Sequence, residues 1–269
     1  MVMLHFDRSA LSRREASPRA LRPLVLVSAF GLFAGCYAEA DENDTGTETF
    51  GADDVGDDMG TESVGGGEAI EIDPANMIDD LEDCDDAIIE QGGRGGSWYS
   101  YNDASGGTQT PSGTQTPASG GVTDSDMCQA MTSGGGFSEW GAGIGFDFVN
   151  DGVAAKMPYD ASEFTGVAFW AKGSVTDLRV NLLIPDVLPE AEGGTCVPSS
   201  PDAGDCSDAH GVAIALTEEW QQFQIDFDMV TQQGWGQAAA FDPARLMSMH
   251  WYIPQDQDFE LALDDIGLY

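Results

Sequence analysis

Several aromatic residues stand where their side chains could contact a ligand. Tyr99 and Tyr101 alternate within a short aromatic run, so they share one face of a predicted strand. Trp235 lies between two glycines, and Trp251 lies in an apolar run near the C-terminus. Flat rings can stack on the C–H faces of sugars, whose hydroxyl groups need polar partners. These four are our candidate carbohydrate-binding residues, although core packing is the more common role of an aromatic residue. The wider set of aromatic candidates includes Trp98, Trp140 and Tyr252.

The histidines give little support for catalysis or for a structural zinc site. Only His210 and His250 follow residue 36, and no Cys-x-x-Cys pair occurs. His210 lies near Asp205 and Asp208, but the G-x-S-x-G motif of a serine nucleophile is absent. We therefore interpret His210 as a surface hydrogen-bonding residue and assign no catalytic residue.

Acidic residues dominate the charge of the chain. It carries 47 Asp and Glu residues against 10 Lys and Arg, a formal net charge of −37. Such a charge repels phosphate backbones and anionic lipid surfaces, so nucleic acid is not expected as a partner. Neutral ligands and cations remain, and calcium is a cation that prefers several oxygen ligands.

The first 36 residues have the order of an export signal. Five arginines precede the apolar run Leu24–Ala34, which is too short to span a bilayer and has the length of a signal-peptide core. The run ends at Gly35 and Cys36, which resembles a bacterial lipoprotein box, with Phe33 where leucine is usual. We predict a signal peptide over 1–35 and lipid attachment to Cys36. Alternatively, Cys36 is an ordinary cysteine behind a generic signal peptide.

An acidic segment separates this signal from the rest of the chain. Residues 37–76 contain 13 Asp or Glu residues and no Lys or Arg. Such a segment cannot bury enough apolar surface to offset the entropy of ordering. We predict that residues 36–76 form a disordered tether, which would hold a folded domain away from a membrane. The expected location is an exported one, on the outer membrane and its periplasmic or cell-surface face.

The remaining cysteines suggest disulfides. Without Cys36, an even number remains in an exported chain, which allows three pairings. We favour Cys84 with Cys128 and Cys196 with Cys206. The second pair would close a short loop rich in Pro, Gly, Ser and Asp.

Residues 77–269 form the predicted folded domain. Its segments of strand character are short and are bounded by Gly, Pro and Asp. They cover 98–102, 144–149, 167–171, 178–184, 212–216, 222–227, 246–253 and 259–269. Short strands at regular spacing predict an all-β sandwich or jelly roll. The stretch 217–221 is predicted to join its two neighbours as a hairpin.

Four stretches of this domain carry a resemblance to a known family. They are Ile78–Asp83, Phe164–Gly173, Leu216–Phe223 and Leu261–Tyr269. In this order they resemble strands of the galactose-binding-like jelly rolls that are common among carbohydrate-binding modules. The resemblance spans 77–269 and implies a β-jelly roll. It suggests sugar binding, although members of this superfamily bind many ligands.

The resemblance also implies a structural calcium ion between the first and last strands. Asp80 and Glu82 match the acids of the first strand, and Asp264 and Asp265 match those of the last. In an alternating strand Asp265 shares a face with Leu263 and points inward, where a carboxylate needs a cation or hydrogen bonds. We therefore predict Asp80, Glu82 and Asp265 as calcium ligands. The alternative is that these acids face solvent.

The sequence GTQTP occurs twice, at 107–111 and 113–117. Two copies are too few for a repeat architecture, and we predict an exposed, flexible insertion.

Taken together, the sequence predicts a membrane-anchored, monomeric lipoprotein that binds a neutral polysaccharide or oligosaccharide without catalysis. Two alternatives stay open. One is a polysaccharide-active hydrolase or lyase on the same fold, since a glycosidase needs two carboxylates and acids are plentiful. The other is an adhesin or structural surface protein that binds another protein.

Overall fold

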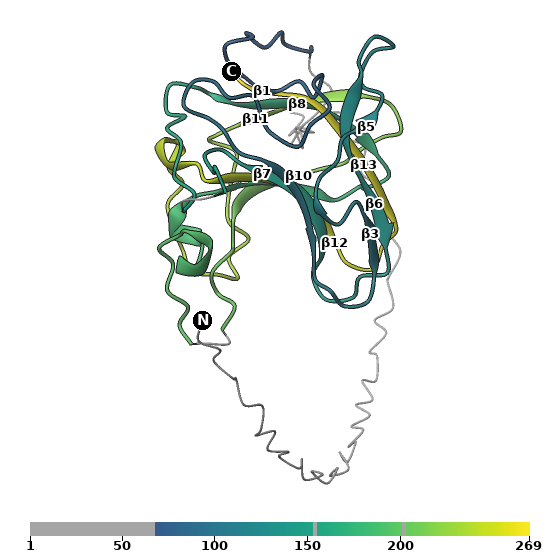
Figure 1. Cartoon of the computed structure of the whole chain (residues 1–269). Coiled ribbons are helices and arrows are strands. Elements are labelled where there is room, and N and C mark those ends of the chain that lie inside the picture. Colours follow the sequence, from purple (N-terminus) through teal and green to yellow (C-terminus); the bar gives the residue numbers. More distant parts are fainter. Residues whose placement is uncertain (1–67, 153–154, 201–202) are drawn as a thin grey trace, which may run out of the picture. The chain divides into compact units, whose positions relative to one another are not determined.

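The chain folds into a sandwich of two antiparallel sheets, which confirms the predicted all-β class. The computed structural model describes residues 68–152, 155–200 and 203–269 (Figure 1). The predicted signal peptide, Cys36 and the predicted tether up to residue 67 lie outside these ranges. Strands and short 3-10 turns are the regular elements of the described part. Within these ranges no helix is long and apolar enough to cross a membrane.

The first sheet, called sheet 1, has the strand order β11-β8-β13-β6-β3. These strands are β11 (Gln221–Asp226), β8 (Gly166–Gly173), β13 (Phe259–Leu268), β6 (Cys128–Gly135) and β3 (Thr108–Thr110). Two short strands complete the sheet: β1 (Met77–Asp79) pairs with β13, and β5 (Ala118–Ser119) pairs with β6.

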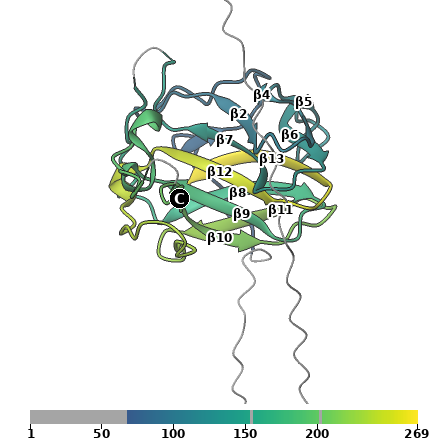
Figure 2. The ribbon, with the colours of Figure 1, turned by 90° about the horizontal axis from the view of Figure 1, so that it is seen from below.

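The second sheet, called sheet 2, has the strand order β10-β9-β12-β7-β2-β4. These strands are β10 (His210–Ile214), β9 (Leu178–Leu183), β12 (Ser248–Pro254), β7 (Gly141–Asp147), β2 (Trp98–Asn102) and β4 (Gly113–Thr114). Figure 2 shows them side by side in this order. The 3-10 turns η1 (Pro185–Val187), η2 (Glu190–Glu192) and η3 (Pro243–Arg245) lie in the connecting loops.

The core lies between the two sheets and contains large aromatic side chains. Trp98 and Trp251 of sheet 2 stack with 5.6 Å between their ring centroids. Phe169 of sheet 1 meets Trp251 edge-on at 5.2 Å, so the two layers interlock through aromatic contacts. Because side chains alternate along a strand, the neighbours Tyr99 and His250 face the opposite side of sheet 2.

The predicted strands are present, but the predicted hairpin at 217–221 is wrong. β10 pairs with β9 in sheet 2, whereas β11 pairs with β8 in sheet 1. The connection therefore carries the chain from one layer to the other. Leu216, which is buried, stabilises this crossing, and its amide donates to the carbonyl of Val175. Polar turn residues occur in both kinds of connection, so composition alone could not separate them.

The prediction that the GTQTP stretches form an exposed, flexible insertion is also wrong. They contribute β3 to sheet 1 and β4 to sheet 2. Their glutamines, Gln109 and Gln115, are buried. The amide of Gln109 donates to Thr132 Oγ1 at 3.1 Å, and that of Gln115 donates to the Met131 carbonyl at 2.7 Å. Buried polar groups with such partners belong to the packed structure.

The folded domain begins before the predicted boundary at residue 77. Ile70 exchanges two hydrogen bonds with the side chain of Gln222 on the edge strand β11, at 2.7 and 2.8 Å. Ile72 is buried and lies over Gly267. The last nine residues of the predicted tether, 68–76, thus belong to the domain, because Ile70 is hydrogen-bonded to an edge strand and Ile72 is buried against β13.

Both favoured disulfides are present. Cys84 is bonded to Cys128, and Cys196 is bonded to Cys206. The first joins the segment after β1 to the start of β6. The second closes the loop that precedes β10.

Candidate functional site

A hollow of about 980 Å³ lies on the outer face of sheet 2. Aromatic, amide and charged side chains line it together with parts of two neighbouring loops. The principal lining residues are Tyr99, Tyr101, Trp140, Asp147, Lys156, Arg179, Asn181, Trp235, His250 and Tyr252. A concave surface that mixes flat rings with a few polar groups is typical of a ligand site.

The strand register aligns many of these residues into two rows across sheet 2. One row contains Tyr99, Gly145, His250 and Asn181, and the next contains Tyr101, Gly143, Tyr252 and Arg179. In both rows the central strand β7 contributes a glycine. A Cβ atom at Gly143 would lie 2.4 Å from the Tyr101 ring, and one at Gly145 would lie 2.5 Å from the His250 ring. The two glycines therefore let these rings lie across β7.

At one end of the hollow, three aromatic rings form what we call the Trp140 cluster, namely Trp140, Tyr101 and Tyr252. The Trp140 ring lies 6.0 Å from Tyr101 and 6.4 Å from Tyr252, measured between centroids. The Tyr252 hydroxyl also donates to the carbonyl of Trp140. Trp140 is nevertheless 41% exposed, so an apolar ring face remains open to solvent.

Trp235 lines the hollow from a different loop and is 54% exposed. It has no ring partner among the described residues, and its indole N–H donates to the Gln233 side chain at 3.3 Å. Such a ring is not held by a hydrophobic core. It therefore presents a second flat apolar surface to whatever enters the hollow.

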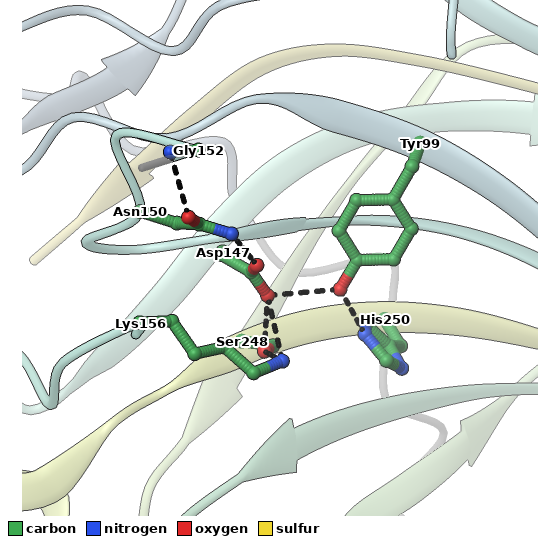
Figure 3. Close-up of polar contacts among 7 residues, drawn as sticks. All are labelled: Tyr99, Asp147, Asn150, Gly152, Lys156, Ser248 and His250. Atoms are coloured by element: carbon green, nitrogen blue, oxygen red, sulfur yellow. Dashed lines mark hydrogen bonds and ion pairs between the residues drawn. The ribbon is translucent and has the colours of Figure 1, made fainter. Parts of the chain in front are cut away.

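The hollow also contains a network of polar side chains (Figure 3). Asp147 accepts hydrogen bonds from the hydroxyls of Ser248 at 2.6 Å and Tyr99 at 3.0 Å. Lys156 Nζ lies 3.1 Å from the same carboxylate oxygen, and Asn150 donates to the other oxygen at 2.7 Å. The Tyr99 hydroxyl also lies 2.7 Å from His250 Nε2.

The environment of this network fixes where its protons lie. Burial raises the pKa of Asp147, but hydrogen bonds and the Lys156 charge outweigh burial and hold it below the usual value. Burial, helped by Lys156, lowers the pKa of His250 to about 3, so its imidazole is neutral. Burial and Asp147 raise the pKa of Tyr99, which stays protonated. Tyr99 therefore donates to Asp147 and accepts from the Nε2–H of His250, which leaves Nδ1 of His250 as an acceptor.

Strand β9 contributes one polar side chain to the end of each row, Asn181 to the first and Arg179 to the second. The side-chain amide oxygen of Asn181 is buried and has no hydrogen-bond partner among the described residues. Arg179 donates to the carbonyls of Thr231 and Ala209, and in the described part of the chain it forms no ion pair. The hollow thus offers the guanidinium group of Arg179, which suits hydroxyl acceptors.

The structure brings three of the four candidate carbohydrate-binding residues to this hollow. Tyr99, Tyr101 and Trp235 line it, together with Trp140 and Tyr252 from the wider set. The prediction that Trp251 contacts a ligand is wrong, because its side chain is 0% exposed and lies in the core. The alternation of β12 turns Trp251 inward and its neighbours His250 and Tyr252 outward.

The predicted calcium ligands have other partners. Asp80 accepts from the amide of Glu82 at 3.3 Å, and both carboxylate oxygens of Glu82 accept from the amide of Met127. Asp265 is half-buried; desolvation and the charges of Asp126, Asp80 and Glu82 raise its pKa to about 6. Among the described residues, no three His, Cys, Asp or Glu side chains are arranged to hold a metal ion. The calcium ion that the sequence suggests at these acids therefore stays a prediction.

The alternation predicted for the last strand also fails at its acids. Asp264 is buried, whereas Asp265 is half-buried and has a φ of 47°. The pairing with β8 shifts register between Asp264 and Gly267, which marks a bulge. The bulge interrupts the alternation at these acids, and Asp264 is buried beneath the segment of Val122, whose amide donates to its carboxylate at 3.0 Å.

The sequence suggested that His210 is a surface residue, and this prediction is wrong. His210 is buried, and its Nε2 lies 2.9 Å from the Ala239 carbonyl. Sequence reasoning also missed the roles of Asp147, Lys156, Arg179 and Asn181 in the hollow. For Asp147, Arg179 and Asn181 the available signal was an outward position on the predicted strands 144–149 and 178–184, but it needed the correct pairing of strands. Lys156 lies in a loop and gave no such signal.

Comparisons with known proteins give structural similarity only. No protein-family model and no curated protein matches the chain. The family 11 carbohydrate-binding module of the cellulosomal cellulase Lic26A-Cel5E of Clostridium thermocellum is similar over 74% of this chain and 95% of its own, at 15% identity and a TM-score of 0.46. The family 30 carbohydrate-binding module of the Clostridium thermocellum cellulase Cel9D-Cel44B is similar over 64% and 90%, at 11% identity and a TM-score of 0.42.

Proposed function

We propose that the hollow on sheet 2 binds a neutral polysaccharide or oligosaccharide without catalysis. The observation that carries this proposal is the pair of exposed tryptophans, Trp140 and Trp235, which line one hollow together with hydrogen-bonding side chains. Exposed indole rings are costly in water and favour a ligand with flat apolar faces. Sugar rings have such faces and are rimmed by hydroxyl groups.

The polar groups of the hollow match hydroxyl groups. His250 Nδ1 can accept from sugar hydroxyls, and Arg179 can donate to them. Lys156 is neutralised by Asp147, and the whole chain is strongly acidic. A polyanionic sugar would therefore face net repulsion, which favours a neutral one.

The absence of catalysis is proposed from the state of Asp147. General acid catalysis needs a carboxyl group with a raised pKa, whereas this carboxylate is held ionised by its donors. It is also fully occupied by Ser248, Tyr99, Lys156 and Asn150. Such a group is suited to positioning its neighbours.

The test is a calorimetric titration of the full chain with soluble neutral polysaccharides (a mixed-linkage β-glucan, a xyloglucan and a galactomannan) and with polygalacturonate. We expect binding to at least one neutral polymer, no binding to polygalacturonate and no release of reducing ends. Trp235→Ala and Tyr101→Ala should each weaken binding roughly ten-fold or more. Trp220→Ala is the matched control, because Trp220 packs against Lys172 away from the hollow. Equal affinity in all four proteins would contradict the proposal.

We further propose that the chain is an exported lipoprotein attached to a membrane through Cys36. The arginine-rich start, the apolar run and Cys36 support this, and the two disulfides suit an oxidising compartment. Metabolic labelling with a palmitate analogue tests it. We expect label in the wild type and none in Cys36→Ser, and label in neither protein would contradict lipidation.

A further inference from the structure

We propose that Asp103 and Asp208 are positioning residues that hold the two tryptophan loops of the hollow in their binding geometry. This inference rests on the proposed function. Each loop exposes an indole ring, and the backbone amides beside each ring converge on one aspartate. We call the two arrangements the Asp103 clamp and the Asp208 clamp.

The Asp103 clamp holds the loop that leads into β7. One carboxylate oxygen of Asp103 accepts from three consecutive amides, those of Glu139 at 3.0 Å, Trp140 at 2.9 Å and Gly141 at 2.8 Å. Its other oxygen accepts from the amide of Ser105 at 2.9 Å. Asp103 directly follows β2, so the clamp ties the Trp140 loop to the strand that carries Tyr101.

The Asp208 clamp holds the loop of Trp235 in the same manner. One oxygen of Asp208 accepts from the amide of Gln233 at 3.0 Å, and the other accepts from Gly234 at 2.8 Å and Gly236 at 3.0 Å. Asp208 is only 2% exposed, so its buried carboxylate oxygens need these donors as partners. Gly234 has a φ of +88°, and a Cβ at Gly236 would lie 2.5 Å from Asp208. Glycines on both sides of Trp235 therefore permit the clamp.

The register places the clamps at opposite ends of sheet 2. Gly141, beside Trp140, pairs with Pro254 at the last residue of β12. Asp208 lies two residues before His210, which pairs with Leu182 near the end of β9. That end of β9 pairs with the start of β12. The two rings are thus fixed at the two ends of the hollow, each by a separate carboxylate.

The arrangement answers a physical problem of exposed aromatic loops. A ring outside the core is not held by packing, and ordering a loop at the moment of binding lowers affinity. Amide hydrogen bonds to a charged acceptor are stronger than neutral ones. A carboxylate also offers enough acceptor sites for three amides, whereas an asparagine would point N–H donors at some of them. The clamp therefore requires aspartate.

The protonation of Asp103 agrees with this role. Burial acts to raise its pKa, but hydrogen bonds from the Ser105 side chain and from the amides of Gly141, Ser105 and Glu139 hold the pKa well below the usual value. The Asp103 clamp is therefore charged throughout the neutral and mildly acidic range.

The experiment measures amide exchange by NMR without ligand, and affinity by calorimetry with the neutral polymer that binds the wild type most tightly. In Asp208→Asn we expect exchange at Gln233, Gly234 and Gly236 to accelerate roughly ten-fold or more, with the amides of 139–141 unchanged. In Asp103→Asn we expect the reverse pattern. Affinity should fall roughly five- to twenty-fold in each.

Asp160→Asn is the matched control, because the described partners of Asp160 are the local amide and hydroxyl of Ser162, and Asp160 does not line the hollow. It should change neither exchange in the two loops nor affinity. Unchanged exchange in the clamped loop, equal acceleration in both loops, or unchanged affinity despite faster exchange would each overturn the proposal. If no polymer binds the wild type, the proposed function fails, and the exchange pattern alone then decides whether the clamps exist.

Discussion

Two sets of buried carboxylates in this domain behave in opposite ways. Asp147, beneath the hollow on sheet 2, has a lowered pKa because hydrogen-bond donors and Lys156 outweigh burial. Among the described residues, Asp264 in sheet 1 accepts only from the amides of Val122 and Asp265, and burial raises its pKa to about 7. Asp79 is similar: burial raises its pKa to about 7 against hydrogen bonds from Trp98 and Leu81. Partners, more than depth, set the charge of a buried acid.

The difference separates a carboxylate with enough hydrogen-bond donors from a group of acids without them. Around Asp147 the ionised state is matched by donors before any ligand arrives, so the hollow is organised in advance. Around Asp264 and Asp265 like charges gather without a cation among the described residues. We expect the ionised carboxylate of Asp147 to stabilise the folded protein. We expect the folded protein to be more stable when the acids of the second set are protonated or replaced.

The largest effect is expected from removing the carboxylate of the matched set. Asp147→Ala leaves the ammonium group of Lys156, which is 15% exposed, without its partner, and also frees Tyr99 and Ser248. Breaking a buried pair in this way costs about 3 kcal/mol of unfolding free energy. Urea denaturation measures the loss. A loss below about 1 kcal/mol would show that the network contributes little.

The pH dependence of stability should come next. Asp79 and Asp264 have a folded pKa of about 7 against 3.8 unfolded, so the folded state retains protons that the unfolded chain releases. Their contribution is full below about pH 4 and is lost as the pH rises through 7. We expect Tm to fall by roughly several degrees between pH 5 and pH 8.

Asp264→Asn is the control for this slope, because general charge repulsion also grows with pH. The variant should flatten the dependence of Tm on pH, whereas Asp186→Asn on the surface should not. A wild-type Tm that is constant from pH 5 to pH 8, or an unchanged slope in Asp264→Asn, would contradict the raised pKa of these buried acids.

A smaller effect is expected at Asp265, which is half-buried beside Asp80, Glu82 and Asp126. Asp265→Asn should raise Tm at pH 7.5 by roughly one or two degrees, because it removes repulsion. Differential scanning fluorimetry with calcium and with a chelator completes the test. Since the described acids are not arranged to hold a metal, we expect the same Tm in both. A calcium-dependent rise in the wild type that is absent from Asp265→Asn would establish the calcium site predicted from the sequence.

The smallest effect is expected at the surface ion pair of Arg245 and Asp186. Both side chains are about 40% exposed and lie 2.6 Å apart. Water and salt screen such a pair, so Asp186→Ala should cost less than about 0.5 kcal/mol. Urea denaturation beside Asp147→Ala gives the comparison directly. Similar losses in the two variants would mean that the partners of Asp147 add nothing beyond an exposed pair.

The sequence predicted the layers better than the details of the site. Short strands with polar turns were enough for a sandwich, and four cysteines after a predicted export signal were enough for two disulfides. The sequence did not show whether a turn joins two strands of one sheet or leads to the other sheet, because both kinds of connection use similar residues. β6 was missed because Ser, Thr and Gly interrupt its apolar pattern.

The site itself depends on the side of a strand that each residue faces. Tyr99 and Tyr101 could be placed from alternation, and Trp235 from its glycine neighbours. Trp251 was misplaced because a single strand does not show which face is covered by the other sheet. The bulge at Asp264 and Asp265 interrupted the alternation there. The matching of Gly143 and Gly145 to neighbouring rings needed the strand register.

The central claim, that the hollow on sheet 2 binds carbohydrate through its two exposed tryptophans, is tested most directly by NMR. The six tryptophan indole N–H signals are followed while the full chain is titrated with a neutral mixed-linkage oligosaccharide series. The account predicts that the signals of Trp140 and Trp235 shift, while those of buried Trp98 and Trp251 and of Trp220 stay in place. Binding that shifts Trp220, or that leaves both Trp140 and Trp235 unchanged, would contradict it.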